Sequence, residues 1–283
     1  MSDKLRAAAR SVDEVRFHTL RLVVFAADLD GEVMRWEREL GRQPVGVTAQ
    51  AVGKTLTWGD GNPESTYSVI ILAAGMAWGL VEDHPTALRT LRHELAHVWG
   101  NLVDLHAFGP EEVGVASNDW PAIKRYWARS VAGEFDAEHY AYDQIPEDAP
   151  RPDDNAFTVE VWSRAVETLA DAVSCYRATR DVRDLWEAVL ALGDPLLQVG
   201  RHLGRLEARK SEDSISEFLA QLPAVSRAGI ALLSRALVGD TKDNEPTVLE
   251  EAFEMIVLAT GVGPVQDPGG LRVIVRDPDS SWE

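Results

Sequence analysis

The sequence is poor in cysteine and in basic residues, and each shortage excludes a class of protein. Among 283 residues only Cys175 is a cysteine, which excludes a disulfide framework and any metal site built from cysteines alone. The apolar neighbours of Cys175 predict a buried thiol. Lysine and arginine number 28 against 46 acids, so the net charge is −18. Direct binding to nucleic-acid phosphates is therefore not expected.

The sequence also lacks long apolar runs. The longest, Val69 to Val81, is too short to span a bilayer, and the N-terminal residues carry no secretory signal. With the single cysteine, these absences predict a cytoplasmic protein without a membrane partner. The 45% of hydrophobic residues is enough for one large domain or two smaller ones.

The acidic residues are concentrated in one stretch of the chain. Residues 1–50 hold eight acids and eight bases, whereas residues 101–160 hold thirteen acids and four bases. An acidic surface most often serves solubility. It is also compatible with an inhibitor or a sequestering factor, which would act by binding a basic partner.

The chain divides into a mixed first half and a helical second half. Strand-forming runs at 17–25, 54–58 and 66–72 accompany a helix signal at 32–40, and the turn residues at 59–63 predict a hairpin. A polar joint at 151–155 separates domains at 1–150 and 151–283. Helical periodicity follows, with a break expected at Gly193-Asp194-Pro195 and a short strand-like run at 271–275. The predicted helices cover residues 157–178, 181–208, 214–221, 223–238 and 246–260.

The segment His93-Glu94-Leu95-Ala96-His97 carries the most specific chemical signal. On a helix, residues four apart lie on one face, so both imidazoles can reach one metal ion and Glu94 can address a water bound there. Successive residues turn by about 100°, which places His97 about 40° and Glu94 about 100° from His93. The apolar side chains of this helix fall between about 140° and 240°, which predicts a buried face separate from the polar one. They are Leu88, Leu91, Leu95, Val98 and Trp99.

The ends of this helix also have signals. Asp83 is expected to cap its first turn and Pro85 to lie within that turn, while Gly100 is expected to end the helix just after the second histidine. These features favour a metal site over a solvated polar face that happens to match the five-residue pattern.

A catalytic zinc ion takes three protein ligands and keeps one position for water, so a third ligand is needed. Residues 118–143 predict a second helix, which begins at Asn118 or Asp119. Glu134 and Glu138 share one face of it, so Glu134 could bind the ion while Glu138 hydrogen-bonds a ligating histidine. The small residues Ala137 and Ala141 suit a close approach of two helices.

Other third ligands remain open. His106 and His139 could ligate the ion in a different geometry. The longer metzincin pattern begins at His93, but its last ligand position is occupied by Val103, which cannot bind a metal.

The two motifs together resemble the zincin metallopeptidases of the ImmA/IrrE type. The match consists of the His93–His97 segment and, 37 residues later, a second segment that differs from the family's usual pattern at Glu138, where asparagine is usual, and at Tyr140, where phenylalanine is usual. That segment reads Glu134-x-x-Ala137-Glu138-x-Tyr140-Ala141, with Pro146 shortly after.

The resemblance implies an α+β fold with one zinc ion held by His93, His97 and Glu134, and with Glu94 as general base. A zincin-like domain at 1–150, with a small mixed sheet, the HExxH helix and a glutamate helix, would precede an all-α region at 151–283. In zincins the strand before the HExxH helix commonly pairs with extended substrate, so residues 66–72 are expected at a sheet edge. Their continuous apolar character equally fits an ordinary core strand.

The expected activity is zinc-dependent hydrolysis of peptide bonds in a protein or peptide, with a regulatory protein as one candidate substrate. Tyr140, His139 and His106 are candidates for stabilising the oxyanion or contacting substrate, and the sequence does not choose among them. Two alternatives stay open: a partner-binding protein whose metal site is structural or vestigial, and a metal-dependent enzyme that is not a peptidase, such as an iron oxygenase with two histidines and one carboxylate.

Overall fold

The computed structural model describes residues 18–47, 51–108, 119–143, 155–209, 212–238 and 246–276. The chain forms two compact units. The first comprises Met1–Val113 and Asp136–Pro150, and the second comprises Gly114–Phe135 and Arg151–Glu283. Helix α5 (Trp120–Asp143) therefore contributes to both units. The class is mixed α and β, as the sequence predicts.

The first unit is built on a three-stranded sheet in the order β1-β3-β2. Its strands are β1 (Leu20–Ala26), β2 (Gly53–Trp58) and β3 (Tyr67–Ala73). Strands β2 and β3 are antiparallel, which confirms the predicted hairpin, and β1 runs parallel to β3.

Strand β3 lies in the centre of the sheet, so the expected edge position of residues 66–72 is wrong. Ile70 and Leu72 pack in a core with helices α3 (Gly75–Val81) and α4 (Pro85–Phe108), whereas Val69 and Ile71 pack in a second core with helix α2 (Leu29–Glu39). A strand that is buried on both faces has apolar residues at consecutive positions, which explains the continuous apolar run of β3. Strand β2, and not β3, is the sheet edge next to α4.

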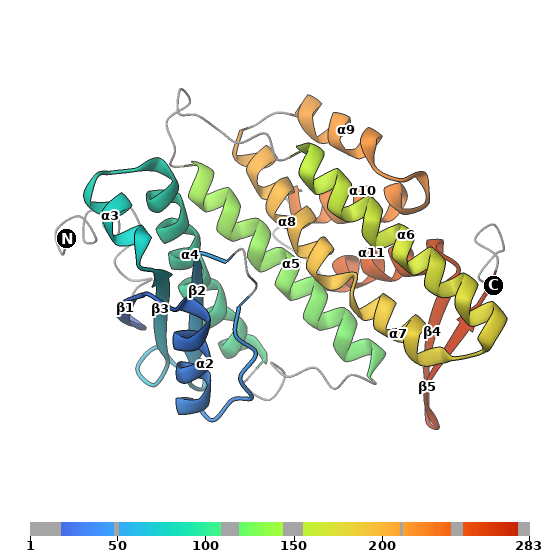
Figure 1. Cartoon of the computed structure of the whole chain (residues 1–283), viewed down its shortest axis with the longest axis horizontal. Helices are drawn as coiled ribbons and strands as arrows, with labels where there is room; N and C mark the ends of the chain where they lie inside the picture. Colours follow the sequence, from blue (N-terminus) through green and yellow to red (C-terminus); the bar gives the residue numbers. More distant parts are fainter. Residues whose placement is uncertain are drawn as a thin grey trace. The chain divides into compact units, whose positions relative to one another are not determined.

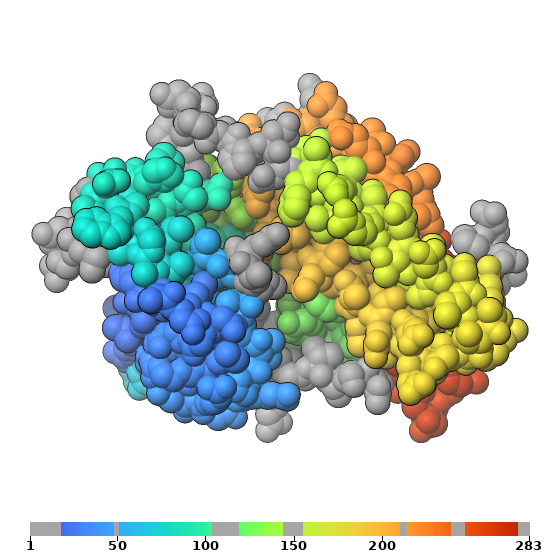
Figure 2. Space-filling model, viewed as in Figure 1, coloured from blue at the N-terminus to red at the C-terminus, as the bar shows by residue number. Residues whose placement is uncertain are grey.

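Three helices cover the sheet: α2 (Leu29–Glu39) on one face, and α3 (Gly75–Val81) and α4 (Pro85–Phe108) on the other (Figure 1). Helix α3 is at the molecular surface (Figure 2), where Trp78 exposes 73% of its area. Helix α4 continues beyond Gly100 to Phe108, so the predicted end at Gly100 is wrong. Gly100 does not have the positive φ that often ends a helix. Asp83 is not the cap of α4 that the sequence predicts, because its φ of 56° is left-handed and the helix begins two residues later, at Pro85.

The second unit consists mainly of helices, and it confirms the helices predicted after residue 155 together with the break near Gly193. They are α6 (Asn155–Thr179), α7 (Val182–Leu190), α8 (Gly193–Ala208), α9 (Glu212–Gln221), α10 (Ala224–Val238) and α11 (Pro246–Ala259).

The expectation of an all-α region is wrong at its end, where β4 (Val262–Asp267) and β5 (Gly270–Val275) form an antiparallel hairpin. Strand β4 contains Gly263 and Pro264, which both have a low strand propensity. The strand forms nevertheless, because its backbone pairs with β5.

One continuous core holds the second unit together. Trp162, Phe218 and Phe253 are almost completely buried in it, and the indole of Trp162 donates a hydrogen bond of 2.8 Å to Ser226. The first half of α5 contributes Ile123 and Val131 to this core. That packing is why residues 114–135 group with the helices although they precede residue 150. A division into domains at residue 150 stays a prediction.

Two further expectations concern exposure. Cys175 is exposed, so the predicted burial of its thiol is wrong. It lies on the outer side of α6, because the buried stripe of that helix runs through Leu169 and Val173. Among the described helices, none combines the length and the apolar character that crossing a bilayer requires.

Close helix packing at Gly229 gives a stability prediction. A Cβ atom there would lie 2.5 Å from Cγ1 of Ile256 and 3.1 Å from the carbonyl oxygen of Ala252, on the neighbouring α11. Gly229→Ala is therefore expected to lower the free energy of unfolding by about 1–3 kcal/mol in urea titrations.

Gly133→Ala is the matched control, because a Cβ atom at this helical glycine meets nothing within 4 Å. It is expected to stabilise the protein by up to about 1 kcal/mol through helix propensity. Equal effects of the two substitutions would contradict the packing account.

Candidate metal centre

The two histidines of α4 converge. His93 and His97 lie one helical turn apart, and their Nε2 atoms are 3.1 Å from each other. The rings meet edge to face, with centroids 4.7 Å apart and an interplanar angle of 83°. Leu91, Leu95 and Val98 of the same helix pack on the sheet, so the apolar face fixes the direction of the imidazoles.

Glu134 of α5 joins the histidine pair. One ligand atom from each of His93, His97 and Glu134 lies within 4.8 Å of the other two, and all three residues are half-buried. Helix α5 begins as expected, because Asp119 accepts a hydrogen bond of 3.0 Å from the backbone N–H of Ala122. The alternative cap Asn118 and the later Pro146 lie outside the described residues.

The three residues form a group that could hold a metal ion, and the donor set suits zinc. Two imidazole nitrogens and one carboxylate oxygen are a ligand combination of catalytic zinc sites. Nitrogen ligands about 2.0–2.1 Å from a tetrahedral ion are about 3.3 Å apart, which is close to the 3.1 Å between the two Nε2 atoms. When the ligand atom of Glu134 is included, the three atoms lie within 4.8 Å of one another. Rotation about the side-chain bonds can shorten a separation of this size.

Glu138 lies one turn after Glu134, on the side of the His93 ring that carries Nδ1. Its Oε1 is 3.8 Å from His93 Nδ1, and the two side chains expose only 9% and 13% of their areas. This separation is longer than a hydrogen bond, so the hydrogen bond expected between Glu138 and a ligating histidine stays a prediction. The contact places a carboxylate on the Nδ1 side of His93, whereas Nε2 faces His97.

Glu94 is buried, and strand β2 holds its carboxylate. Only 6% of the residue is exposed. The hydroxyl of Thr55 donates toward Glu94 Oε2 at 2.7 Å and toward the Glu94 carbonyl oxygen at 2.9 Å. A Cβ atom at Gly53 would lie 2.8 Å from Glu94 Oε1, so the absence of a side chain there makes room for the carboxylate. One face of β2 thus holds Oε2 by a hydrogen bond and leaves space for Oε1.

Thr55 and Gly53 were not identified from the sequence. The signal is the alternation of small and hydroxyl residues at Gly53, Thr55 and Thr57, which share one face of the strand. Thr57 also faces α4, because it accepts a hydrogen bond of 3.2 Å from Asn101. Asn101 lies two turns after Glu94, so β2 contacts the same side of α4 twice.

The small residues Ala137 and Ala141, expected where two helices approach closely, lie in the second half of α5. Ala137 and Ala141 are completely buried. Further along, Arg89 donates a hydrogen bond of 2.6 Å to the Tyr142 hydroxyl and lies over its ring. These contacts fix the second half of α5 against α4 in the first unit.

Two of the three oxyanion candidates lie on other sides of α5 than Glu134. His139 and Tyr140 are half-buried on α5, at about 140° and 240° around the helix from Glu134, whereas Glu138 is at about 40°. His106 lies nine residues beyond His97 on α4, about 13 Å further along the helix axis, and its side chain is outside the described part. Their roles as oxyanion donors or third ligands stay untested predictions.

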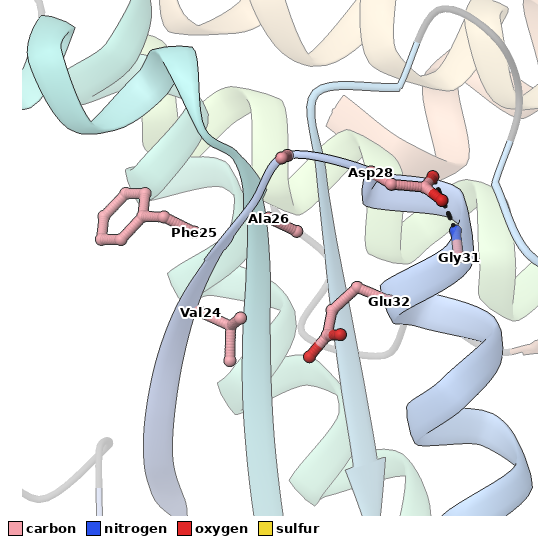
Figure 3. A pocket seen from close by; sticks show the side chains of 7 residues that line it. Val24, Phe25, Ala26, Asp28, Gly31 and Glu32 are labelled. Atoms are coloured by element: carbon pink, nitrogen blue, oxygen red, sulfur yellow. Dashed lines mark hydrogen bonds between the residues drawn. The ribbon is translucent and has the colours of Figure 1, made fainter.

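A separate hollow of about 570 Å³ lies where β1 ends and α2 begins (Figure 3). Its polar groups already have partners: Asp28 accepts a bond from the backbone of Gly31, and Glu32 pairs with Arg35, which holds the pKa of that carboxyl below its usual value. The hollow contains none of the metal-binding candidates.

Comparison with known proteins adds no constraint: no family model, no curated protein and no solved structure matches this chain. The geometry of the His93, His97 and Glu134 group and its neighbours is therefore what bears on the function of this chain.

The contact between Thr55 and Glu94 predicts a stability effect. Thr55→Val keeps the shape of the side chain but leaves a buried carboxylate oxygen without this donor, so it should lower the free energy of unfolding by about 1–3 kcal/mol. Thr55→Ser retains the hydroxyl and should cost less. Chemical denaturation of both variants measures the difference, and a valine variant as stable as the serine variant would contradict the hydrogen bond.

Proposed function

We propose that the chain is a zinc-dependent endopeptidase with a zincin-like catalytic unit. The observation that carries the proposal is the convergence of His93, His97 and Glu134, together with the buried carboxylate of Glu94, the residue that follows His93 in the sequence. A site that only stabilised the fold would need the three ligands but would have no use for Glu94 beside the first of them.

His93, His97 and Glu134 would hold the ion, and Glu138 would favour the His93 tautomer that carries its proton on Nδ1 and offers Nε2 as ligand. When bound, zinc supplies a Lewis acid that polarises the scissile carbonyl and lowers the pKa of a water molecule. That chemistry needs a base within reach of the water, and Glu94 is adjacent to the first ligand in the sequence.

Glu94 would act as general base and then as general acid. Its carboxylate accepts a proton from water as the water oxygen adds to the carbonyl carbon, and it returns that proton to the amine nitrogen as the peptide bond breaks. Thr55 donates to Oε2 and would keep the carboxylate in one orientation during both transfers. Burial excludes competing water from this side of the group.

The substrate class is a protein or peptide. The resemblance to ImmA/IrrE-type zincins supports this class, and the mixed α and β architecture of the first unit, in which the HExxH helix packs on a small sheet, agrees with it. Two alternatives make different predictions. A partner-binding protein would not cleave peptide bonds, and a non-peptidase metal enzyme such as an iron oxygenase would contain a different metal. The following experiments measure both properties.

The first experiment is Glu94→Gln. The amide keeps the shape of the side chain but cannot accept the proton, so cleavage of an unfolded protein substrate should fall by about 10²–10⁴-fold. Zinc content should stay unchanged, because Glu94 is not a ligand. Glu82→Gln, an exposed residue at the end of α3, is the matched control and should retain full turnover. Undiminished cleavage by Glu94→Gln would exclude the proposed mechanism.

The second experiment measures the metal itself. Protein purified without added metal and analysed by mass spectrometry should contain one zinc per chain, and His97→Ala should lose most of it. Dialysis against a chelator should abolish cleavage, and added zinc should restore it. Stoichiometric iron in place of zinc would instead favour the oxygenase alternative.

A further inference from the structure

Glu134 has a second partner, which comes from the helical part of the chain. Nε of Arg201 on α8 lies 2.7 Å from Glu134 Oε2. The ion pair is shielded from solvent, since the Glu134 side chain exposes 15% of its area and that of Arg201 exposes 31%. Both residues belong to the second unit, so their contact is part of its internal packing.

Two glycines of α8 allow this contact. A Cβ atom at Gly193 would overlap the ring of Trp127, at 1.7 Å from Cη2, and one at Gly200 would lie 2.9 Å from the carbonyl oxygen of Val131. The glycines are two turns apart on α8, and they face successive turns of α5. The helices therefore lie side by side (Figure 1), and Arg201 directly follows the close contact at Gly200.

We propose that Arg201 is a positioning residue of the metal centre, which fixes the carboxylate of Glu134 so that one oxygen is held by the guanidinium while the other serves as metal ligand. This inference rests on the proposed function, because it takes Glu134 as a ligand. It adds a residue from α8, outside both sequence motifs, to the site.

The chemistry of arginine suits this role. A carboxylate ligand that is also hydrogen-bonded loses less side-chain freedom when it binds an ion, and partners of this kind typically change metal affinity about 10–100-fold. Guanidinium remains charged at any physiological pH and presents its N–H groups in a rigid plane, so it holds one oxygen in a defined direction. A lysine in the same place supplies charge without that direction.

The test is the zinc affinity of Arg201→Gln, measured by competition with a chromophoric chelator. The variant is expected to bind zinc about 10–100-fold more weakly than the unaltered chain. The visible absorption bands of the cobalt-substituted protein are expected to shift, because they report the geometry of the ligands. Arg201→Lys should recover part of the affinity. In a Glu134→Gln background, Arg201→Gln should cause no further loss.

Arg164→Gln is the matched control. Arg164 also pairs with a glutamate, at 2.7 Å from Glu160, but that pair is exposed on α6. This variant should leave both zinc affinity and the cobalt spectrum unchanged. If Arg201→Gln does not fold, Arg201→Lys decides the question, and wild-type zinc affinity in that variant would overturn the inference.

The outcomes separate this inference from the proposed function. If the unaltered chain binds no zinc, the proposed function fails and the inference fails with it. If the unaltered chain binds one zinc and Arg201→Gln binds it equally well, with the same cobalt spectrum, only the role of Arg201 is refuted. Tighter zinc binding by Arg201→Gln would also refute it, because Arg201 would then compete with the metal.

Discussion

The packing of α4 on β3 is the constraint on which the candidate site depends. Leu91, Leu95 and Val98 are buried against the sheet, and this burial fixes the rotation of the helix about its axis. The histidines then face away from the sheet. Glu94 lies between the apolar face and the histidine face of the helix, about 100° from His93. That intermediate position is why Thr55 on the adjacent edge strand reaches Glu94, whereas the histidines are reached from α5.

Helix α5 connects this arrangement to the rest of the chain. Its second half carries Glu138 and Ala141 in the first unit, and its first half carries Val131 into the core of the second. Glu134 lies where these halves meet and contacts Arg201 of α8. The position of this proposed metal ligand thus depends on packing within the helical unit, which under the proposal gives the helices after residue 155 a role beyond stability.

The sequence predicted the elements that depend on local patterns and missed those that depend on tertiary contacts. Periodicity predicted α5, and Gly193-Asp194-Pro195 predicted the break near Gly193. The two motifs predicted that His93, His97 and Glu134 come together. The central position of β3, the continuation of α4 past Gly100 and the strand β4 are decided by neighbours that are distant in sequence. Thr55 and Arg201 were missed for the same reason, because neither belongs to a motif and only the folded chain brings them to their glutamates.

X-ray absorption at the zinc edge tests the central claim most directly, because it reports the atoms around the ion itself. For the zinc-reconstituted chain, we expect two imidazole ligands and light oxygen or nitrogen donors at about 2.0–2.2 Å, with no sulfur. The oxygen contribution should change in Glu134→Gln. A spectrum with more than two imidazoles, or one that is identical in Glu134→Gln, would contradict the proposed ligand set.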